Sequence, residues 1–146
     1  MRVLVVDDES DIRMVIHAAL DSDTCLDAAD GPTALSLLDR HPVDVVLLDV
    51  MMPGMDGLEV LRRLRQTLGG DVPVVMLTAR GAESDHVHAS RAGADAYVTK
   101  PFDIDELAAV VAEVVARSPK QRLQMRAVEL GKAELLRRLE TAFPAR

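Results

Sequence analysis

Five polar residues each stand at or just beyond the end of a short apolar run. In an open parallel sheet, ligands bind outside the carboxyl ends of the strands, so these side chains are expected to meet at one edge. Taken singly, each has an ordinary structural explanation, such as a helix cap, a turn or a solvated surface charge. No such explanation covers all of them together. The residues are Asp7, Asp8, Asp49, Thr78 and Lys100.

These residue types suit phosphoryl transfer to a carboxylate. Three carboxylates held close together repel one another unless a cation lies between them. Oxygen ligands without His or Cys favour Mg²⁺, which keeps several waters and leaves coordination positions open to phosphoryl oxygens. The hydroxyl of Thr78 and the ammonium of Lys100 suit the remaining oxygens, and a carboxylate can itself be the nucleophile.

The apolar runs before these residues predict strands that are buried on both faces. Continuous rather than alternating apolar character is typical of a parallel sheet covered on both sides. Segments with helical periodicity lie between the runs, so strand and helix alternate five times, which predicts a doubly wound α/β domain. The expected strands are Val3–Val6, the weaker Thr24–Ala28, Val43–Leu48, Val74–Leu77 and Ala96–Val98.

Proline and acidic residues indicate where helices begin. Pro32 is expected in the first turn of the second helix. Asp103, with Glu106 three residues later, resembles a capping box at the start of the fifth helix. The fourth helix, near residues 83–91, has Val87 as its only large apolar residue, so we expect it to be loosely held.

The segment after Ser118-Pro119 differs from the rest of the chain. Pro119 removes a backbone donor and disturbs the preceding turn, so we expect a domain at residues 1–117 and a helical extension at residues 118–146. Apolar residues of the extension form one helical stripe, interrupted by Gly131, which favours a packing or dimerising helix over a nucleic-acid arm. The stripe contains Met125, Val128, Leu135, Leu139 and Ala142.

Composition excludes several classes of protein. The chain has 146 residues, a usual size for one domain, and 49% of them are apolar, which excludes intrinsic disorder. One Tyr and two Phe are too few for a surface that stacks nucleic-acid bases. The single cysteine, Cys25, cannot form an internal disulfide. No signal peptide or membrane span can be drawn, so a cytoplasmic location is expected.

The charge of the chain is unevenly distributed. The net charge is -7, while residues 118–146 hold seven Lys/Arg and three Glu, a net +4, which leaves residues 1–117 at -11. Such an acidic body is a poor match for a nucleic-acid phosphate backbone.

Four segments closely resemble the receiver domain of two-component response regulators. They occur in order and at suitable spacing over residues 1–117, and four motifs of one family are stronger evidence than one short pattern. The resemblance implies the CheY-like, flavodoxin-like (βα)5 fold with strand order 2-1-3-4-5, to which this chain adds a C-terminal helix. The segments are Val5-Val6-Asp7-Asp8-Glu9, Leu47-Leu48-Asp49-Val50-Met51-Met52-Pro53-Gly54-Met55-Asp56-Gly57, Leu77-Thr78-Ala79 and Gly93-Ala94-Asp95-Ala96-Tyr97-Val98-Thr99-Lys100-Pro101-Phe102.

The resemblance implies a role for each acidic residue. Asp49 would accept a phosphoryl group from the phosphohistidine of a sensor kinase or phosphotransfer protein. Asp8, Asp49 and the backbone carbonyl of Met51 would bind Mg²⁺, with Asp7 acting on the ion through water. Met51 and Arg80 flank the phosphoryl group in this family and are expected to tune the access of water to it.

The resemblance also implies a switch. Lys100 would pair with the phosphoryl oxygens or Asp49, and the Lys100-Pro101 peptide bond would be cis. Thr78 would move to bond the phosphoryl group, and Tyr97 would turn inward behind it. The expected output face is the fourth helix, fifth strand and fifth helix, through which phosphorylation would change binding of a downstream protein or homodimer formation.

Several functions remain to be separated. The first is a stand-alone receiver, which is not an enzyme beyond its own phosphorylation and dephosphorylation. The second is the receiver part of a DNA-binding transcriptional regulator whose effector domain is absent from this chain. A phosphatase with an aspartyl-phosphate intermediate would want Asp-x-Asp after the first strand, whereas Asp7 and Asp8 are adjacent. A flavin carrier would want a Ser/Thr/Gly-rich loop there.

Overall fold

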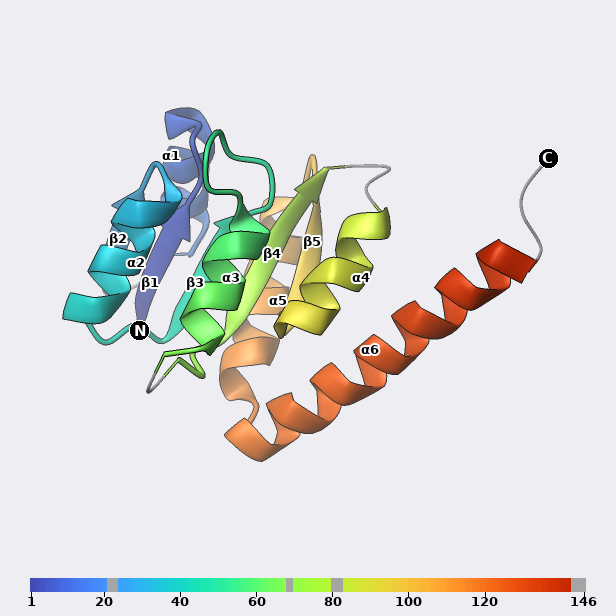
Figure 1. Ribbon diagram of the computed structural model, residues 1–146. Helices are drawn as coiled ribbons and strands as arrows, with labels where there is room; N and C mark the ends of the chain where they lie inside the picture. The colour runs from blue at the N-terminus through green and yellow to red at the C-terminus, as the bar shows by residue number, and fades with distance from the viewer. Residues whose placement is uncertain (21–23, 68–69, 80–82, 143–146) are drawn as a thin grey trace.

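A five-stranded parallel sheet of order β2-β1-β3-β4-β5 forms the centre of the molecule (Figure 1). The computed structural model describes residues 1–20, 24–67, 70–79 and 83–142. The strand order confirms the expected doubly wound topology, and the weak second strand pairs with β1 along its whole length. The strands are β1 (Arg2–Val6), β2 (Thr24–Ala28), β3 (Val45–Asp49), β4 (Val74–Ala79) and β5 (Ala96–Lys100).

Helices cover both faces of the sheet, and one further helix follows them. The first and fifth helices contact each other on one face, while the second, third and fourth lie on the other. The sixth runs from the end of the fifth helix alongside the fourth (Figure 1). The helices are α1 (Ser10–Leu20), α2 (Gly31–Arg40), α3 (Gly57–Arg65), α4 (Glu83–Ala92), α5 (Ile104–Ala116) and α6 (Pro119–Ala142).

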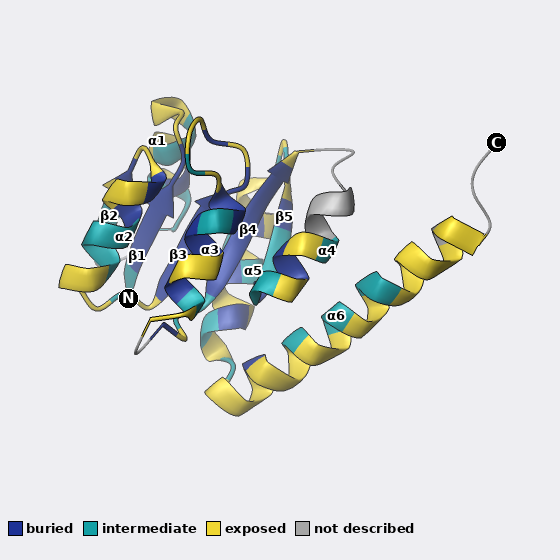
Figure 2. Ribbon diagram, viewed as in Figure 1, coloured by how far each residue is buried: buried dark blue, intermediate teal, exposed yellow. Residues whose placement is uncertain are grey.

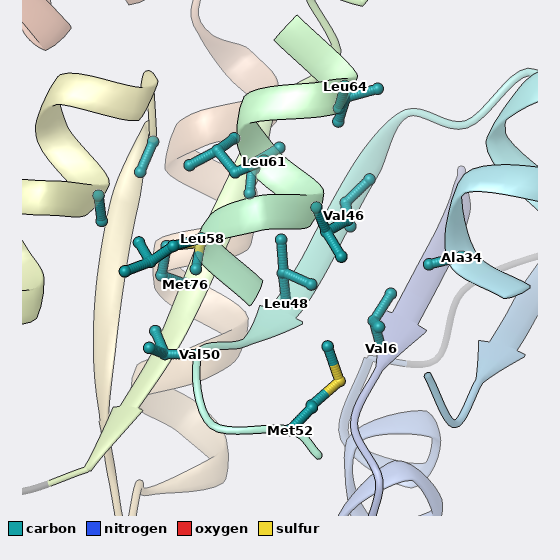
Figure 3. Close-up of a cluster of buried hydrophobic side chains, with 14 of the residues drawn as sticks. Val6, Ala34, Val46, Leu48, Val50, Met52, Leu58, Leu61, Leu64 and Met76 are labelled. Atoms are coloured by element: carbon teal, nitrogen blue, oxygen red, sulfur yellow. The ribbon is translucent and has the colours of Figure 1, made fainter. Parts of the chain in front are cut away.

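Successive residues of the strands enter opposite halves of the core. On β3, Val46 and Leu48 pack under α2 and α3 (Figure 3), whereas Val45 and Leu47 pack under α1 and α5. Side chains alternate between the two faces of any strand. Because both faces are covered here, both sets are apolar, which explains the continuous apolar runs of the sequence.

Several strand ends differ from the sequence prediction, two of them by one residue, since β1 begins at Arg2 and β3 ends at Asp49. β3 begins at Val45, because pairing with β1 starts at Val3 opposite Val45. β4 continues through Thr78 to Ala79, and Ala79 pairs with Lys100 at the end of β5. The polar residues predicted to follow β4 and β5 therefore continue the ladder, since pairing does not require an apolar side chain.

Side-chain caps fix the starts of several helices. Asp30 and Asp56 accept backbone hydrogen bonds at α2 and α3, and Asp103 caps α5 by accepting one from the Asp105 N–H at 2.7 Å. Ser118 and Gln121 form a reciprocal capping box at α6, with bonds of 3.1 and 2.8 Å. This box ends α5 and starts α6, and the prediction from Pro119 alone did not include it.

The described part of the chain contains no helix that is long and apolar enough to cross a membrane.

A substitution at Leu48 tests the half of the core that lies between the sheet and helices α2 and α3. It is fully buried between the sheet and α3 (Figure 3). We expect Leu48→Ala to lower the free energy of unfolding by about 2–5 kcal/mol, because it removes buried apolar contacts and leaves a cavity. Urea denaturation measures this loss. Met14→Ala is the control, because Met14 is 68% exposed on α1, and it should change stability by less than about 0.5 kcal/mol. Equal effects of the two substitutions would contradict this packing.

Candidate functional site

Asp7, Asp8 and Asp49 meet at the carboxyl edge of the sheet. Val6 pairs with Leu48, which brings the end of β1 beside the end of β3. One carboxylate oxygen from each residue lies within 4.8 Å of the others. Asp7 and Asp49 are buried, whereas Asp8 is exposed. The sequence prediction that these carboxylates converge is therefore correct in its geometry.

Lys100 supplies the positive charge nearest to this cluster. Its Nζ donates a hydrogen bond of 2.7 Å to Oδ2 of Asp7 and lies 3.4 Å from Oδ1 of Asp49. Burial by itself would lower the pKa of Lys100, but the bond to Asp7 and the charge of Asp49 outweigh it and raise the pKa. The ammonium therefore stays charged and ties the end of β5 to β1 and β3.

The carboxyl group of Asp49 is protonated more readily than that of an ordinary aspartate. Burial raises its pKa to about 6, and the charge of Asp7 adds to the rise, against the opposing effects of Lys100 and the N–H of Met51. The attraction of Lys100 thus does not offset burial and the charge of Asp7. An added cation would lower this pKa by the same electrostatic logic, and clustered carboxylate oxygens are the donors that Mg²⁺ prefers. The residues present fit a Mg²⁺ ion.

The turn after β3 positions the carboxylate of Asp49. The Met51 N–H donates to Oδ1 of Asp49 at 3.2 Å, and the Gly57 N–H donates to the Val50 carbonyl at 3.0 Å. A Cβ atom on Gly57 would lie 2.1 Å from the backbone oxygen of Asp49, closer than any side chain can approach. Only glycine allows α3 to begin this near the site.

A second set of bonds holds Asp7, and sequence reasoning missed one member. Oδ1 of Asp7 accepts a bond of 2.9 Å from the Glu9 N–H, and the Asp7 carbonyl accepts one of 2.6 Å from Nη1 of Arg13. Arg13 also lies 3.6 Å from Asp27 of β2. The signal was an arginine six residues after Asp7 on α1, but spacing alone does not say that the side chain folds back onto the strand end.

Thr78 is buried on the strand next to Asp49, whereas the Tyr97 side chain bonds a helix. Thr78 is fully buried near the end of β4, one residue beyond Leu77, which pairs with Asp49. Tyr97 of β5 is partly buried, and its hydroxyl bonds the hydroxyl of Ser90 on α4. Burial raises the pKa of Tyr97. In this structure the Tyr97 hydroxyl therefore bonds α4. The inward position that the resemblance implies for Tyr97 would replace that bond.

Of the remaining predicted site residues, the structure describes Met51 and Pro101. Met51 is 66% exposed on the loop beside Asp49, and the Lys100-Pro101 peptide bond is cis. Arg80 lies outside the described residues.

Comparison with known proteins identifies one family. The model of the response regulator receiver domain matches residues 3–112. The transcriptional regulatory protein TcrA of Mycobacterium tuberculosis is 44% identical over 124 residues, which are 84% of this chain and 49% of TcrA. The chain thus spans about half the length of the curated relatives it matches.

Solved structures agree with the sequence matches. A putative response regulator from Chloroflexus aurantiacus superposes with a TM-score of 0.76 at 33% identity, covering 80% of this chain and 98% of that one. NtrX from Brucella abortus superposes with a TM-score of 0.72 at 28% identity, covering 97% of this chain and 29% of NtrX. The first match leaves about a fifth of this chain unpaired, whereas the second takes in nearly all of it.

The raised pKa of Asp49 predicts a specific pH dependence of stability. A carboxyl whose pKa is about 6 when folded and about 3.8 when unfolded stabilises the fold below pH 4, and that contribution is lost as the pH rises from about 4 to 6. Without divalent ions, Asp49→Asn should therefore raise the free energy of unfolding at pH 7.5 by roughly 1–3 kcal/mol, with little gain at pH 4.

Urea denaturation of both proteins over this pH range, with a chelator present, measures the difference. Asp39→Asn, an exposed position on α2, is the matched control and should leave the profile unchanged. A wild-type profile parallel to that of Asp49→Asn would contradict the electrostatic origin of the shift.

Proposed function

Because this chain belongs to the response regulator receiver domain family, we propose that Asp49 is its phosphoacceptor. The family is a signalling module rather than an enzyme class, and membership in a two-component system implies a histidine kinase as partner. The observation that carries the proposal is the convergence of Asp7, Asp8 and Asp49 beside Lys100. Family membership also favours this function over the phosphatase and flavin-carrier alternatives.

In the proposed reaction, a carboxylate oxygen of Asp49 attacks the phosphorus of a phosphohistidine. The new O–P bond replaces the N–P bond, and the imidazole leaves, so no oxidant or reductant is needed. Asp8, Asp49 and the Met51 carbonyl would hold Mg²⁺, with Asp7 acting through water, and the ion would neutralise charge on the transferred group. Lys100, already charged and held by Asp7, is placed to bind a phosphoryl oxygen.

The signal would leave the site through Thr78 and Tyr97. A phosphoryl group adds negative charge and strong acceptor oxygens, which can draw the Thr78 hydroxyl toward Asp49. Tyr97 would then exchange its bond to Ser90 for the inward position. The proposed output face is α4, β5 and α5, since Tyr97 and Ser90 belong to two of these elements.

Two outputs are proposed as alternatives. The chain acts either as a stand-alone receiver that binds a downstream protein, or as the receiver part of a DNA-binding transcriptional regulator. The name of the TcrA relative and its greater length support the second alternative. The sequence of the full-length gene product decides between them, because a further downstream domain would exclude the stand-alone receiver.

The proposed domain boundary lies at residue 117. The family match ends at residue 112, α5 ends at Ala116 and Ser118 caps α6, which supports a receiver at 1–117 and an extension at 118–146. Homodimer formation and a cytoplasmic location stay predictions. Solution mass of the chain with and without beryllofluoride, a phosphoryl mimic, tests the first, and a monomer in both conditions would exclude a dimer.

Incubation with Mg²⁺ and acetyl phosphate tests the phosphoacceptor. We expect one labile phosphoryl group per chain by intact mass spectrometry, because Asp49 lies beside Asp7 and Asp8, which would hold the metal ion with it. Labelling should be abolished by Asp49→Asn and by chelation of the metal, and it should persist in the control Asp39→Asn. Labelling of the Asp49→Asn protein, or labelling with the metal chelated, would overturn the assignment.

A further inference from the structure

Helix α6 lies against α4, which belongs to the proposed output face, and it bonds Asp95 just before β5 (Figures 1 and 2). Few of its apolar residues face the body. Leu130 and Ala133 are half-buried, whereas the other large apolar side chains of α6 are exposed, including Val128 at 51% and Leu135 at 57%. The burial colours agree, because α6 is largely exposed apart from a narrow row of residues (Figure 2). An ionic interaction also keeps the helix on the body.

Two arginines of α6, one turn apart, supply this interaction. Arg122 donates through Nη2 to Oδ2 of Asp71 at 2.8 Å and to the Asp71 carbonyl. Arg126 donates to Oδ1 of Asp95 at 2.9 Å and to Oδ1 of Asp71 at 2.8 Å. The side chains of Arg122 and Arg126 are only 5% and 13% exposed. Solvent-exposed ion pairs contribute little. Asp71 is 57% exposed, whereas Asp95 is 1% exposed, so the bond between Arg126 and Asp95, which is buried on both sides, is the more costly one to break.

Asp95 is the centre of this anchor. Its side chain is 1% exposed and lies immediately before β5. Besides Arg126 it accepts bonds from Nη2 of Arg65 at 3.0 Å and from the Val74 N–H at 2.9 Å. Asp95 would thus keep two partners from the body if α6 left. Residues 1–117 therefore supply part of the hydrogen bonding of this carboxylate, and α6 adds one further bond through Arg126.

The anchor also contains an excess of positive charge. Three guanidinium groups, those of Arg65, Arg122 and Arg126, share the two carboxylates of Asp71 and Asp95. Burial and the charge of Arg126 together lower the pKa of Arg65 to about 10, against the opposing effect of Asp95. Docking of α6 therefore crowds Arg65, and release of α6 would relieve that repulsion. This balance suits a contact that can open.

The rest of α6 reaches the residues of the proposed switch. Glu134 of α6 accepts a bond of 3.3 Å from Nε of Arg91 on α4. The charge of Glu129 on α6 contributes to the raised pKa of Tyr97. Tyr97 in turn bonds Ser90 of α4. Helix α6 therefore contacts α4, the helix whose bond to Tyr97 would change if that side chain turned inward.

We propose that the α4–β5 surface, with Asp71 and Asp95 at its base, is a docking surface for an arginine-bearing helix, and that α6 occupies it within the same chain. A partner that uses this surface must displace α6, and a helix that offers two guanidinium groups one turn apart has the matching chemistry. The surface and its occupant stand on the contacts described above. Their meaning for signalling rests on the proposed function of Asp49.

Hydrogen–deuterium exchange on the full chain tests whether α6 covers the α4–β5 surface. Arg126→Ala removes one anchor, so we expect amides of α6, of residues 87–92 and of β5 to exchange about tenfold faster, with β1 and β3 unchanged. Lys132→Ala is the matched control, because Lys132 lies on the same helix, is 66% exposed and pairs only with nearby Glu129. Unchanged protection of α4 and β5 in Arg126→Ala would overturn the proposal.

A peptide of residues 118–142, added in trans and followed by fluorescence anisotropy, tests the recognition chemistry. Three full-length proteins are compared: the wild type, Arg126→Ala, and a locked protein. The locked protein carries Cys25→Ser, Arg91→Cys and Glu134→Cys and is joined by a short bis-maleimide, which leaves the buried anchor intact. We expect the peptide to bind Arg126→Ala at least about tenfold more tightly than the wild type, because the tethered helix competes at a high effective concentration. The locked protein should bind it least.

The outcomes of this comparison are distinct. A peptide with both arginines replaced by alanine should lose binding to all three proteins. Equal affinity of the native peptide for the three proteins, or equal binding of the substituted peptide, would overturn the proposal. Labelling of the same proteins with acetyl phosphate reports on Asp49 separately, so a failed phosphoacceptor and a failed cover give different results.

Discussion

The arrangement of the molecule depends on the repulsion among three carboxylates at one edge of the sheet. Asp7, Asp8 and Asp49 are brought together by the pairing of β1 with β3, which the buried apolar residues enforce. Lys100 offsets part of the charge, and the pKa of Asp49 remains raised to about 6. The core thus holds together an edge that would otherwise spread apart. A cation bound among these oxygens would relieve that repulsion, which is why the donor set fits Mg²⁺.

A second charged cluster lies at the opposite end of the strands, and it has an excess of positive rather than negative charge. Asp95 stands before the start of β5, whereas Lys100 stands at its end. One end of this edge strand is therefore tied to the acidic site, and the other is tied to α6 through Arg126. Tyr97 lies between them on the same strand. A change at Asp49 that moved Tyr97 would act on a strand whose two ends are fixed by ionic contacts, so the side chain rather than the strand is the element free to move.

Most of the fold and of the acidic site could be predicted from the sequence. Apolar runs identify strands because burial on both faces leaves little choice of residue, and parallel topology then places Asp7, Asp8, Asp49 and Lys100 at one edge. Exact strand ends could not be predicted. Thr78 and Lys100 are polar yet still belong to the ladder, because backbone pairing is indifferent to the side chain at a strand end.

The contacts that the sequence did not indicate are those made by long side chains. Arg13 reaches back to the Asp7 carbonyl, and Arg122 and Arg126 reach Asp71 and Asp95, which lie between 31 and 55 residues earlier in the chain. The apolar stripe of α6 is not its contact with this domain, since Val128 and Leu135 are exposed while the arginines face the body. A dimerising role of the stripe stays a prediction. Guanidinium groups are soluble when free and bind strongly when matched to buried carboxylates, so no pattern in the sequence separates the two cases. Residues 118–146 carry a net charge of +4 and residues 1–117 carry -11, so the two segments attract each other. Asp71 and Asp95 determine where on the body the Arg126 side chain of α6 binds. A helix held in this way can be exchanged for another with the same two charges, which an apolar interface of equal size would not allow.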